Sequence, residues 1–374
     1  LQQVLVGVLG EVRLAVGDFQ AMQEQVRRLL DRLASSEEHS PDVDETRAFF
    51  EWLLDHHFTF LGYEEFVVVE DEQGARVEYD ESTLLGLSRQ LRAGLSNEQR
   101  AIEPSALTFL REPRLLSFAK AAQPSHVHRA AYPDLVSLRM MDEDGRVVRE
   151  CRFLGLYTSA LYTESVTRIP SVRRKVEAIL VRSGFDPHAH LGKELAQVLE
   201  ALPRDELFQT PVDELYDTAI AIVQIQERNK LRLFLRKDPY GRFVYCLVYV
   251  PRDHYSTEIR VKIQNLLMER LNASDCEFWT YFSESVLARV QLILRVDPKT
   301  VPAFDTRVLE QEVIQACRSW QDEFSSLMIE RFGEARGTDL LARFAPGFPA
   351  GYRERFEPHS AVADMQHLRS LSDE

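Results

Sequence analysis

Three pairs of closely spaced histidines are the residues in this sequence whose type and spacing could bind a metal ion. The pairs are His56 with His57, His126 with His128, and His188 with His190. Side chains two residues apart on a strand share one face, so a strand at 126–128 would let both imidazoles ligate zinc. No third ligand follows at a usual spacing, and the favoured alternative is an exposed loop near Pro124. We therefore predict no metal site, and expect the first pair at a helix end and the last solvated beside a helix start.

A second candidate is the segment 250–255 (VPRDHY), which joins a predicted buried strand to a predicted helix. A strand end that leads into a helix N-terminus is a natural place for a small anion, because free backbone N–H groups point outward there. Arg252 could hold a carboxylate and the amides near Ser256 could add donors, with Asp253 and Tyr255 completing a candidate effector or interface loop. The favoured alternative is a rigid connector in which Arg252 and Asp253 pair.

The segment 203–208 (PRDELF) concentrates charge in a short turn between two predicted helices. Arg204 could be presented there to the carboxylate of a partner. The favoured alternative is structural: Arg204 and Asp205 form a capping or inter-helix pair, while Leu207 and Phe208 fill a core.

Motifs that bind nucleotides or mark common hydrolases are absent from the sequence. It contains no GxGxxG and no GxxxxGK followed by Ser or Thr. Without close-approach glycines at a strand-to-helix turn, the backbone does not cradle a pyrophosphate in the usual way. GxSxG and HExxH are absent as well. We predict no catalytic and no cofactor-binding residue in this chain; a dispersed hydrolytic site around His126, His128 and nearby acids is an alternative.

The composition is typical of a globular chain of two or three domains: of the 374 residues, 45% are hydrophobic and 28% are charged. Fifty-nine acidic residues against 45 basic ones give a formal charge of −14, which repels phosphate backbones and argues against nucleic-acid partners. The four cysteines form no CxxC pair, which favours a reducing, cytoplasmic compartment. No stretch approaches the roughly 20 apolar residues that span a bilayer, so no membrane partner is expected. A first residue other than Met suggests a piece of something longer.

The pattern of residues 1–44, the lead-in, predicts two helices and a linker. Apolar residues, Leu5 and Leu9 among them, recur at helical spacing until Gly17 interrupts the pattern before a second helix. After a polar, proline-bearing linker at 34–44, Asp44 is the expected cap of a third helix.

Residues 45–165 change to the period of β structure. The run 58–69 is rich in aromatic and β-branched residues, and two alternating runs flank 142–145 (DEDG), which predicts an antiparallel hairpin. Residues 166–229 return to helical spacing, and Gly184 is placed to end the first helix of this connector.

Residues 230–332 predict elements in the order ββαββα. The four strands are expected at 231–236, 243–250, 276–282 and 288–296. One long closing helix is expected to carry a single apolar face, formed by Leu309, Val313, Cys317, Trp320, Phe324 and Leu327. Residues 333–374 predict a helical segment that leads to further domains. On the sheet faces, Tyr249, Trp279 and Tyr281 could anchor an interface, although core packing is favoured for each.

Six runs along the chain, in order, closely resemble the N-terminal half of the large bacterial NAD-specific glutamate dehydrogenases. They are 58–63 (FTFLGY), 127–129 (VHR), 152–159 (RFLGLYTS), 203–209 (PRDELFQ), 240–243 (YGRF) and 247–252 (LVYVPR). The resemblance extends over nearly the whole chain, and none of the runs is a generic nucleotide-binding pattern.

The resemblance implies an α+β fold, with a PAS-like antiparallel sheet domain over 45–165 and an ACT-like (ferredoxin-like) domain over 230–332, joined by helical segments. It implies a non-catalytic regulatory and oligomerisation segment, with other domains and subunits of a homo-oligomeric enzyme as partners and an amino acid as effector. The full-length enzyme would convert L-glutamate, NAD and water to 2-oxoglutarate, ammonium and NADH. Its catalytic and NAD-binding residues would lie beyond Glu374, so no cofactor is expected in this segment. A stand-alone amino-acid sensor of PAS-like and ACT-like modules is the alternative.

One departure from the ACT pattern yields a prediction of its own. An ordinary ACT unit runs βαββαβ, with its fourth strand antiparallel beside its first, whereas this chain has no clear strand after its long closing helix. We predict that 231–236, hairpin-paired to 243–250, fills the place of the fourth strand from the opposite end of the sequence. The departure also weakens any transfer of ACT amino-acid binding to this chain.

Overall fold

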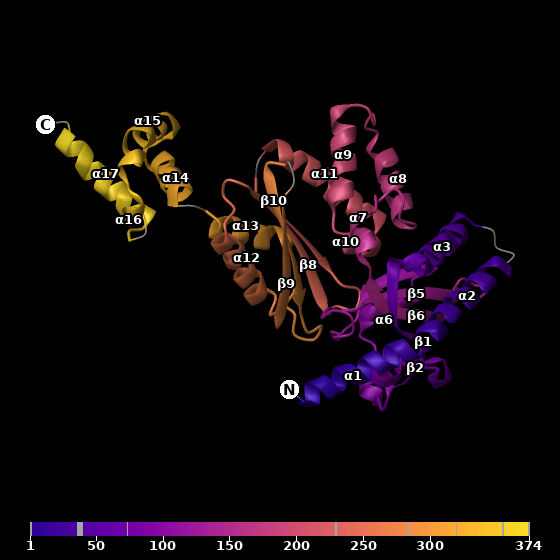
Figure 1. The fold of residues 1–374 in the computed structure, drawn as a ribbon. Helices are drawn as coiled ribbons and strands as arrows, with labels where there is room; N and C mark the ends of the chain where they lie inside the picture. Colours follow the sequence, from indigo (N-terminus) through magenta and orange to yellow (C-terminus); the bar gives the residue numbers. More distant parts are fainter. Residues whose placement is uncertain are drawn as a thin grey trace. The chain divides into compact units, whose positions relative to one another are not determined.

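The computed structural model describes residues 2–35, 40–72, 74–228, 230–282, 285–318, 320–353 and 355–372 (Figure 1). Two compact units divide the chain. The first contains 1–228 with the later segments 236–245 and 295–299, and the second contains 229–235, 246–294 and 300–374. None of the helices in the described ranges is both long and apolar enough to span a bilayer.

Helices lead into the first sheet. They are α1 (Gln2–Gly17), α2 (Phe19–Ser35), α3 (Pro41–Trp52) and the π-helical turn η1 (Leu53–His57). The predicted break after Gly17 is confirmed. The apolar spacing of α1 does not produce a fully buried face: Leu5 and Leu9 are 53% and 66% exposed, whereas Ala15 joins a buried cluster and Val12 packs against it. Spacing alone shows that a helix is apolar, not that a neighbouring element covers it.

The helix α3 begins at a serine cap instead of the expected Asp44. The hydroxyl of Ser40 accepts a hydrogen bond from the backbone N–H of Val43 at 3.3 Å, and Pro41 occupies the first helical position. Both residue types are typical of a helix start. Asp44 lies in the first turn, where a carboxylate complements the helix dipole. The predicted linker 34–44 is too long, because α2 extends to Ser35 and α3 begins at Pro41; residues 36–39 lie outside the described ranges.

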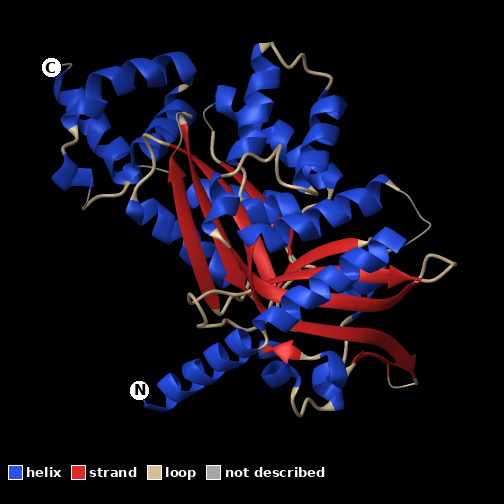
Figure 2. Ribbon diagram, turned by 45° about the vertical axis from the view of Figure 1, so that its right-hand side comes forward, coloured by secondary structure: helices blue, strands red, loops and turns tan. Residues whose placement is uncertain are grey.

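An antiparallel sheet forms the centre of the first unit, and its strands are drawn as red arrows in Figure 2. The described strands are β1 (Phe58–Asp71), β2 (Gly74–Tyr79), β3 (Leu85–Gly86), β4 (Leu116–Lys120), β5 (Asp134–Met141) and β6 (Val147–Tyr157). They follow the order β2-β1-β6-β5-β4, with β3 paired to β1, and all these pairs are antiparallel. β5 and β6 form the predicted hairpin, in whose turn the N–H of Gly145 donates to the carbonyl of Asp142 at 3.0 Å.

The pairing of β1 with β6 brings two of the resembling runs, 58–63 and 152–159, side by side. Phe58 lies opposite Tyr157, and Phe153 packs edge-on against Phe60 at a centroid distance of 5.6 Å. A Cβ on Gly155 would lie 2.3 Å from the carbonyl oxygen of Thr59, so only glycine fits at this point of the pair.

Short helices surround the sheet and a helical connector follows it. The short elements are η2 (Glu81–Thr83), α4 (Leu87–Arg92), α5 (Asn97–Arg100), α6 (Pro104–Arg111) and α7 (Ser159–Thr163). The connector contains α8 (Val172–Ser183), α9 (His190–Ala201), α10 (Arg204–Gln209) and α11 (Val212–Arg228). Gly184 ends α8 with a left-handed φ of 65°, as predicted.

A second sheet has the strand order β7-β8-β10-β9. Its elements are β7 (Arg232–Lys237), β8 (Phe243–Pro251), α12 (Thr257–Arg270), β9 (Asp275–Phe282), β10 (Leu287–Arg295) and α13 (Thr306–Ala316). β7 is the hydrogen-bonded neighbour of β8 at one edge, so the prediction that an N-terminal strand fills the fourth-strand place is confirmed. The predicted α+β class is confirmed as well, because both described sheets are accompanied by helices.

The prediction of a single long closing helix is wrong. α13 ends at Ala316, and a separate helix α14 (Trp320–Phe332) begins beyond Ser319, which lies outside the described residues. α14 packs with α15 (Glu334–Phe344), η3 (Ala345–Gly347), α16 (Ala350–Arg353) and α17 (Pro358–Ser372). Phe324 and Met328 belong to a cluster of these C-terminal helices. The periodic apolar face is therefore shared by two helices, and periodicity does not reveal which core each part fills.

Candidate ligand pocket

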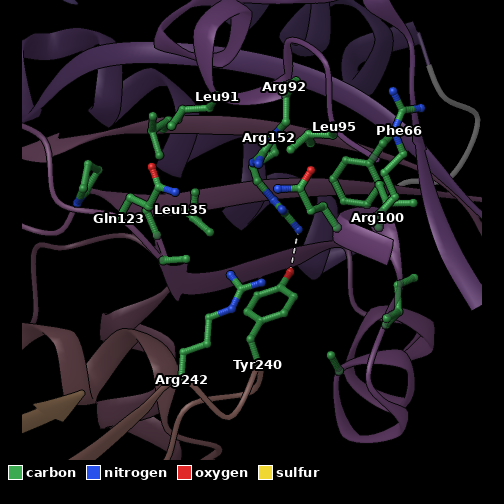
Figure 3. A pocket seen from close by; sticks show the side chains of 18 of the residues that line it. Phe66, Leu91, Arg92, Leu95, Arg100, Gln123, Leu135, Arg152, Tyr240 and Arg242 are labelled. Atoms are coloured by element: carbon green, nitrogen blue, oxygen red, sulfur yellow. Dashed lines mark hydrogen bonds between the residues drawn. The ribbon is translucent and has the colours of Figure 1, made fainter. Parts of the chain in front are cut away.

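A pocket of about 520 Å³ lies within the first unit (Figure 3). Its walls come from β1, β2, β6, the segment 87–110 and residues 121–125. Two further parts are the turn that holds Tyr240 and Arg242, and residues 297–299. Five cationic side chains line it: Arg92, Arg100, Arg152, Arg242 and Lys299. Three acidic side chains do so too: Glu11, Glu103 and Asp297.

Strand register places a buried ionic network behind this pocket. Glu64 of β1 lies directly opposite Arg152 of β6, and Glu150 of β6 lies opposite Arg139 of β5. Because Glu150 and Arg152 are two residues apart on one strand, the four side chains share one face of the sheet. All four are at most 6% exposed, so their charges depend on each other rather than on water.

Carboxylates and guanidiniums alternate through short hydrogen bonds in this network. Arg92 of α4 donates through two nitrogens to the two oxygens of Glu64, at 2.7 and 2.9 Å. Arg152 donates to Glu150 at 2.6 Å, and Arg139 donates to the other oxygen of Glu150 at 3.1 Å. Burial alone would raise the pKa of Glu150, but Arg152 and Arg139 hold that pKa below its ordinary value.

Tyr240 and Arg242 complete the pocket from the turn after β7. The hydroxyl of Tyr240 accepts a hydrogen bond from Arg152 at 2.5 Å, and Figure 3 shows the Arg242 guanidinium beside the same ring. The guanidinium carbons of Arg242 and Arg152 lie 5.3 and 5.6 Å from the ring centroid of Tyr240. Burial, with repulsion from Arg152 and Arg92, lowers the pKa of Arg242. Within the described residues, no carboxylate comes within ion-pairing distance of its guanidinium.

A buried carboxylate shapes the turn that presents these two residues. Asp238 accepts hydrogen bonds from the backbone N–H groups of Tyr240 and Arg242, at 2.9 and 3.4 Å. Such a side-chain-to-backbone pair is typical of an Asx turn. Burial raises the pKa of Asp238 to about 6.

The loop predicted as an effector or interface site is built as a helix entry in the second unit. Ser256 caps α12 by accepting from the N–H of Ile259 at 3.2 Å, and the hydroxyl of Tyr255 lies 3.0 Å from that of Thr280. The guanidinium of Arg252 lies over the ring of Phe282 at 5.6 Å, and the side chain of Asp253 is 69% exposed. These contacts do not test a ligand role, which stays a prediction.

The histidine pairs lie where the non-metal alternatives placed them. His126 and His128 are exposed in a loop, and the described residues contain no cluster of three or more side chains able to hold a metal ion. His188 and His190 are exposed around the start of α9. His57, at the end of η1, stacks on Trp52 at 4.2 Å and contacts its carbonyl oxygen through Nδ1 at 2.9 Å.

Arg204 has the structural role, with different partners from those predicted. It is 7% exposed and donates to the carbonyl oxygens of Leu161, Glu164 and Glu200, and to the carboxylate of Glu200 at 3.0 Å. Asp205 instead lies 3.5 Å from Lys120. The expected pair of Arg204 with Asp205 is wrong because adjacent helical residues point in different directions. Leu207 and Phe208 are buried, as predicted.

The three candidate interface aromatics divide between core and surface. Tyr249 is 8% exposed and belongs to the core, as favoured. Trp279 and Tyr281 of the edge strand β9 are 49% and 46% exposed, so the favoured core packing is wrong for them. Phe278 and Phe282 on the same strand are exposed to a similar degree.

Sequence reasoning missed the pocket. The signal was present as charge inside two runs that otherwise read as buried strands: Glu64 and Glu65 in β1, and Arg149, Glu150 and Arg152 in β6. Buried charges of opposite sign on two strands indicate pairing across them. That inference needs the β1–β6 register, which the sequence pattern does not supply.

Three protein-family models match the chain, and they share one enzyme class. They are "Glutamate dehydrogenase, helical motif 1" at 169–228, "Glutamate dehydrogenase, ACT2 domain" at 232–321 and "Glutamate dehydrogenase, helical motif 2" at 327–371. The ACT2 match falls on the sheet in which β7 takes the fourth-strand place. The three matches together cover the helical connector, the second sheet with its helices and the C-terminal helices.

Curated relatives identify the group more closely. The chain is 65% identical to an NAD-specific glutamate dehydrogenase of Pseudomonas aeruginosa, 41% to that of Halomonas elongata and 28% to that of Mycobacterium tuberculosis. Each match extends over 100% of this chain and 23% of the relative. The resemblance seen in the sequence is therefore confirmed: the whole chain matches a segment of NAD-specific glutamate dehydrogenases.

One solved structure shows a weak similarity to the chain. A blue-light activated histidine kinase of Erythrobacter litoralis aligns over 63% of this chain and 95% of its own, at 10% identity and a TM-score of 0.18. A TM-score of that size carries no argument about fold or function.

Proposed function

We propose that this chain is a non-catalytic regulatory and assembly segment of a cytoplasmic, homo-oligomeric NAD-dependent glutamate dehydrogenase. The observation that carries the proposal is the 65% identity, over the whole chain, to a protein named for that activity. The chain spans 23% of that relative, so the reaction belongs to the complete enzyme. That enzyme would convert L-glutamate, NAD and water to 2-oxoglutarate, ammonium and NADH.

The chemistry of the described residues favours a non-catalytic role. Their charged clusters are ion pairs and caps that stabilise the fold, and no nucleophile with an adjacent base is among the contacts described above. The sequence has no glycine fingerprint for a pyrophosphate, so we assign NAD to the remainder of the enzyme. The four free cysteines support a reducing compartment. The exposed aromatics of β9 support contact with other domains or subunits.

A segment exchange tests this proposal. The corresponding segment of the Pseudomonas aeruginosa enzyme is replaced by this chain, and glutamate-dependent NADH formation and the number of subunits per oligomer are measured. We expect both to be close to those of the parent enzyme, and both to be lost or altered when the segment is deleted. A deletion variant with an unchanged number of subunits, rate and response to effectors would contradict the proposal.

A stand-alone small-molecule sensor is the second candidate, and the pocket of about 520 Å³ is the observation that favours it. Thermal unfolding of the isolated chain with and without amino acids separates the two. A sensor that acts alone predicts ligand-dependent stabilisation of the chain together with failure of the exchanged segment to support the enzyme.

A further inference from the structure

We propose that the pocket of the first unit binds a small organic dianion, with carboxylate or phosphate groups held by Arg242 against the rings and guanidiniums of the wall. The proposal goes beyond the proposed function, because it assigns a binding site and a class of ligand whatever enzyme contains the chain. Figure 3 shows the central side chains, with Arg152 hydrogen-bonded to the Tyr240 hydroxyl and Arg242 beside the Tyr240 ring.

The buried network behind the pocket contains more guanidinium groups than carboxylates. Three guanidiniums, of Arg92, Arg139 and Arg152, are held by two carboxylates, those of Glu64 and Glu150. A second oxygen on a ligand could accept from this excess of donors. Guanidinium pairs with carboxylate or phosphate through two parallel hydrogen bonds, which gives both strength and orientation.

Arg242 adds a cation that is in no ion pair with a described carboxylate. Asp238 attracts the guanidinium, but its carboxylate accepts hydrogen bonds from the backbone of the turn. Desolvation, together with repulsion by Arg152 and Arg92, outweighs this attraction and makes the charge of Arg242 costly without a ligand. An anion placed between Arg242 and the wall would remove that cost.

The remaining wall suits an organic anion. Tyr240 accepts a hydrogen bond from Arg152, so its own hydroxyl proton is free to donate to a ligand oxygen. The ring of Phe66 and the side chains of Leu91 and Leu95 supply apolar surface beside these donors. A volume of about 520 Å³ is within the roughly 300–1,000 Å³ of small-molecule sites.

Calorimetric titration of the 374-residue chain at low salt tests the site. The probes at pH 8 are succinate for carboxylate, inorganic phosphate for phosphate, and succinamide as the neutral analogue of succinate. We expect at least one dianion to bind, more weakly as salt is added because screening reduces the attraction. Binding by succinate alone or by phosphate alone identifies which acidic group the natural ligand carries.

Two variants and one matched control separate the site from non-specific attraction. Arg242→Gln is expected to weaken dianion binding about ten- to a hundred-fold, the loss of a charged hydrogen bond. Tyr240→Phe is expected to weaken it by a factor of about two to ten. Arg182→Gln removes an exposed arginine that also lies over a tyrosine ring, that of Tyr216 at 4.2 Å, but outside the pocket, and should leave binding unchanged.

Three results would each overturn the inference. The first is that neither dianion binds at concentrations up to about 10 mM, ten times a millimolar dissociation constant. The second is that succinamide binds as tightly as succinate. The third is that R242Q and R182Q weaken binding equally while circular dichroism shows both variants folded. None of these results affects the segment exchange, so the two proposals fail independently.

Discussion

Removal of the Glu150 carboxylate is the sharpest test of the buried network. Glu150 is 2% exposed and accepts from Arg139 and from two nitrogens of Arg152, at distances from 2.6 to 3.1 Å. In Glu150→Ala, Arg139 still donates a hydrogen bond to the backbone carbonyl of Glu112. Arg152 keeps a more distant contact with Glu64 at 3.5 Å. Two buried cations are thus left poorly compensated.

The expected cost follows from this geometry. Breaking a buried ion pair by removing one partner costs about 3–5 kcal/mol, because the remaining charge stays desolvated. The matched control is Glu78→Ala on β2, whose partner Arg76 is 2.9 Å away but whose own side chain is 46% exposed. An exposed pair contributes about 0–1 kcal/mol. We therefore expect the first variant to lose at least about 2 kcal/mol more than the second.

Urea unfolding followed by tryptophan fluorescence provides the measurement. The chain has three tryptophans, and replacing Trp279 and Trp320 by Phe leaves Trp52 as the reporter of the first unit. A lower midpoint with an unchanged slope indicates a loss of stability without a change in the surface exposed. If E150A is destabilised no more than E78A, the buried network does not stabilise the sheet. The fixed charges behind the pocket would then lack the role assigned to them.

Three further predictions address the sheet, the turn and a cap. Gly155→Ala places a Cβ 2.3 Å from the carbonyl oxygen of Thr59 and should cost about 1–3 kcal/mol or more in urea unfolding; Gly10→Ala, with nothing within 4 Å, should be neutral or stabilising. Asp238 has a folded pKa of about 6, above its unfolded value of about 3.9, so its contribution to stability is present below about pH 4 and is lost as pH rises through 6. Asp238→Asn should therefore remove about 3 kcal/mol of the pH dependence of unfolding between about pH 4 and 7, and an identical pH profile in the variant would contradict this. Ser40→Ala should cost about 1 kcal/mol through loss of the α3 cap, whereas Asp44→Ala, in the first turn, should cost less; thermal unfolding that ranks them in the opposite order would restore Asp44 as the main determinant of the helix start.

Local signals with a direct chemical meaning were sufficient for much of the fold. Glycines that interrupt or end helices, at Gly17 and Gly184, and the turn 142–145 were placed correctly, because each depends on the conformation of a few neighbouring residues. The place of β7 could be predicted because a hairpin joins strands that are adjacent in sequence.

Features that depend on distant partners were beyond the sequence pattern. The apolar spacing from Leu309 to Leu327 is the same whether one helix or two carry it, so the break before Trp320 was missed. The pocket brings Arg92, Arg152 and Arg242 together from three separate segments. Their proximity depends on strand register and on the packing of a turn, which a single sequence does not encode in any local period.

The position of β7 also has a consequence for the order in which the ACT-like sheet forms during synthesis. In an ordinary βαββαβ unit the edge pairing beside the first strand must wait until the last strand emerges, and it closes a loop as long as the domain. In this chain β7 and β8 are separated only by the turn 238–242, so that edge can pair as soon as both strands have left the ribosome. Short loops cost less entropy to close and local contacts form faster. The rearranged order thus turns the slowest pairing of the fold into one of its earliest, and gives the later strand β10 a preformed template on which to add.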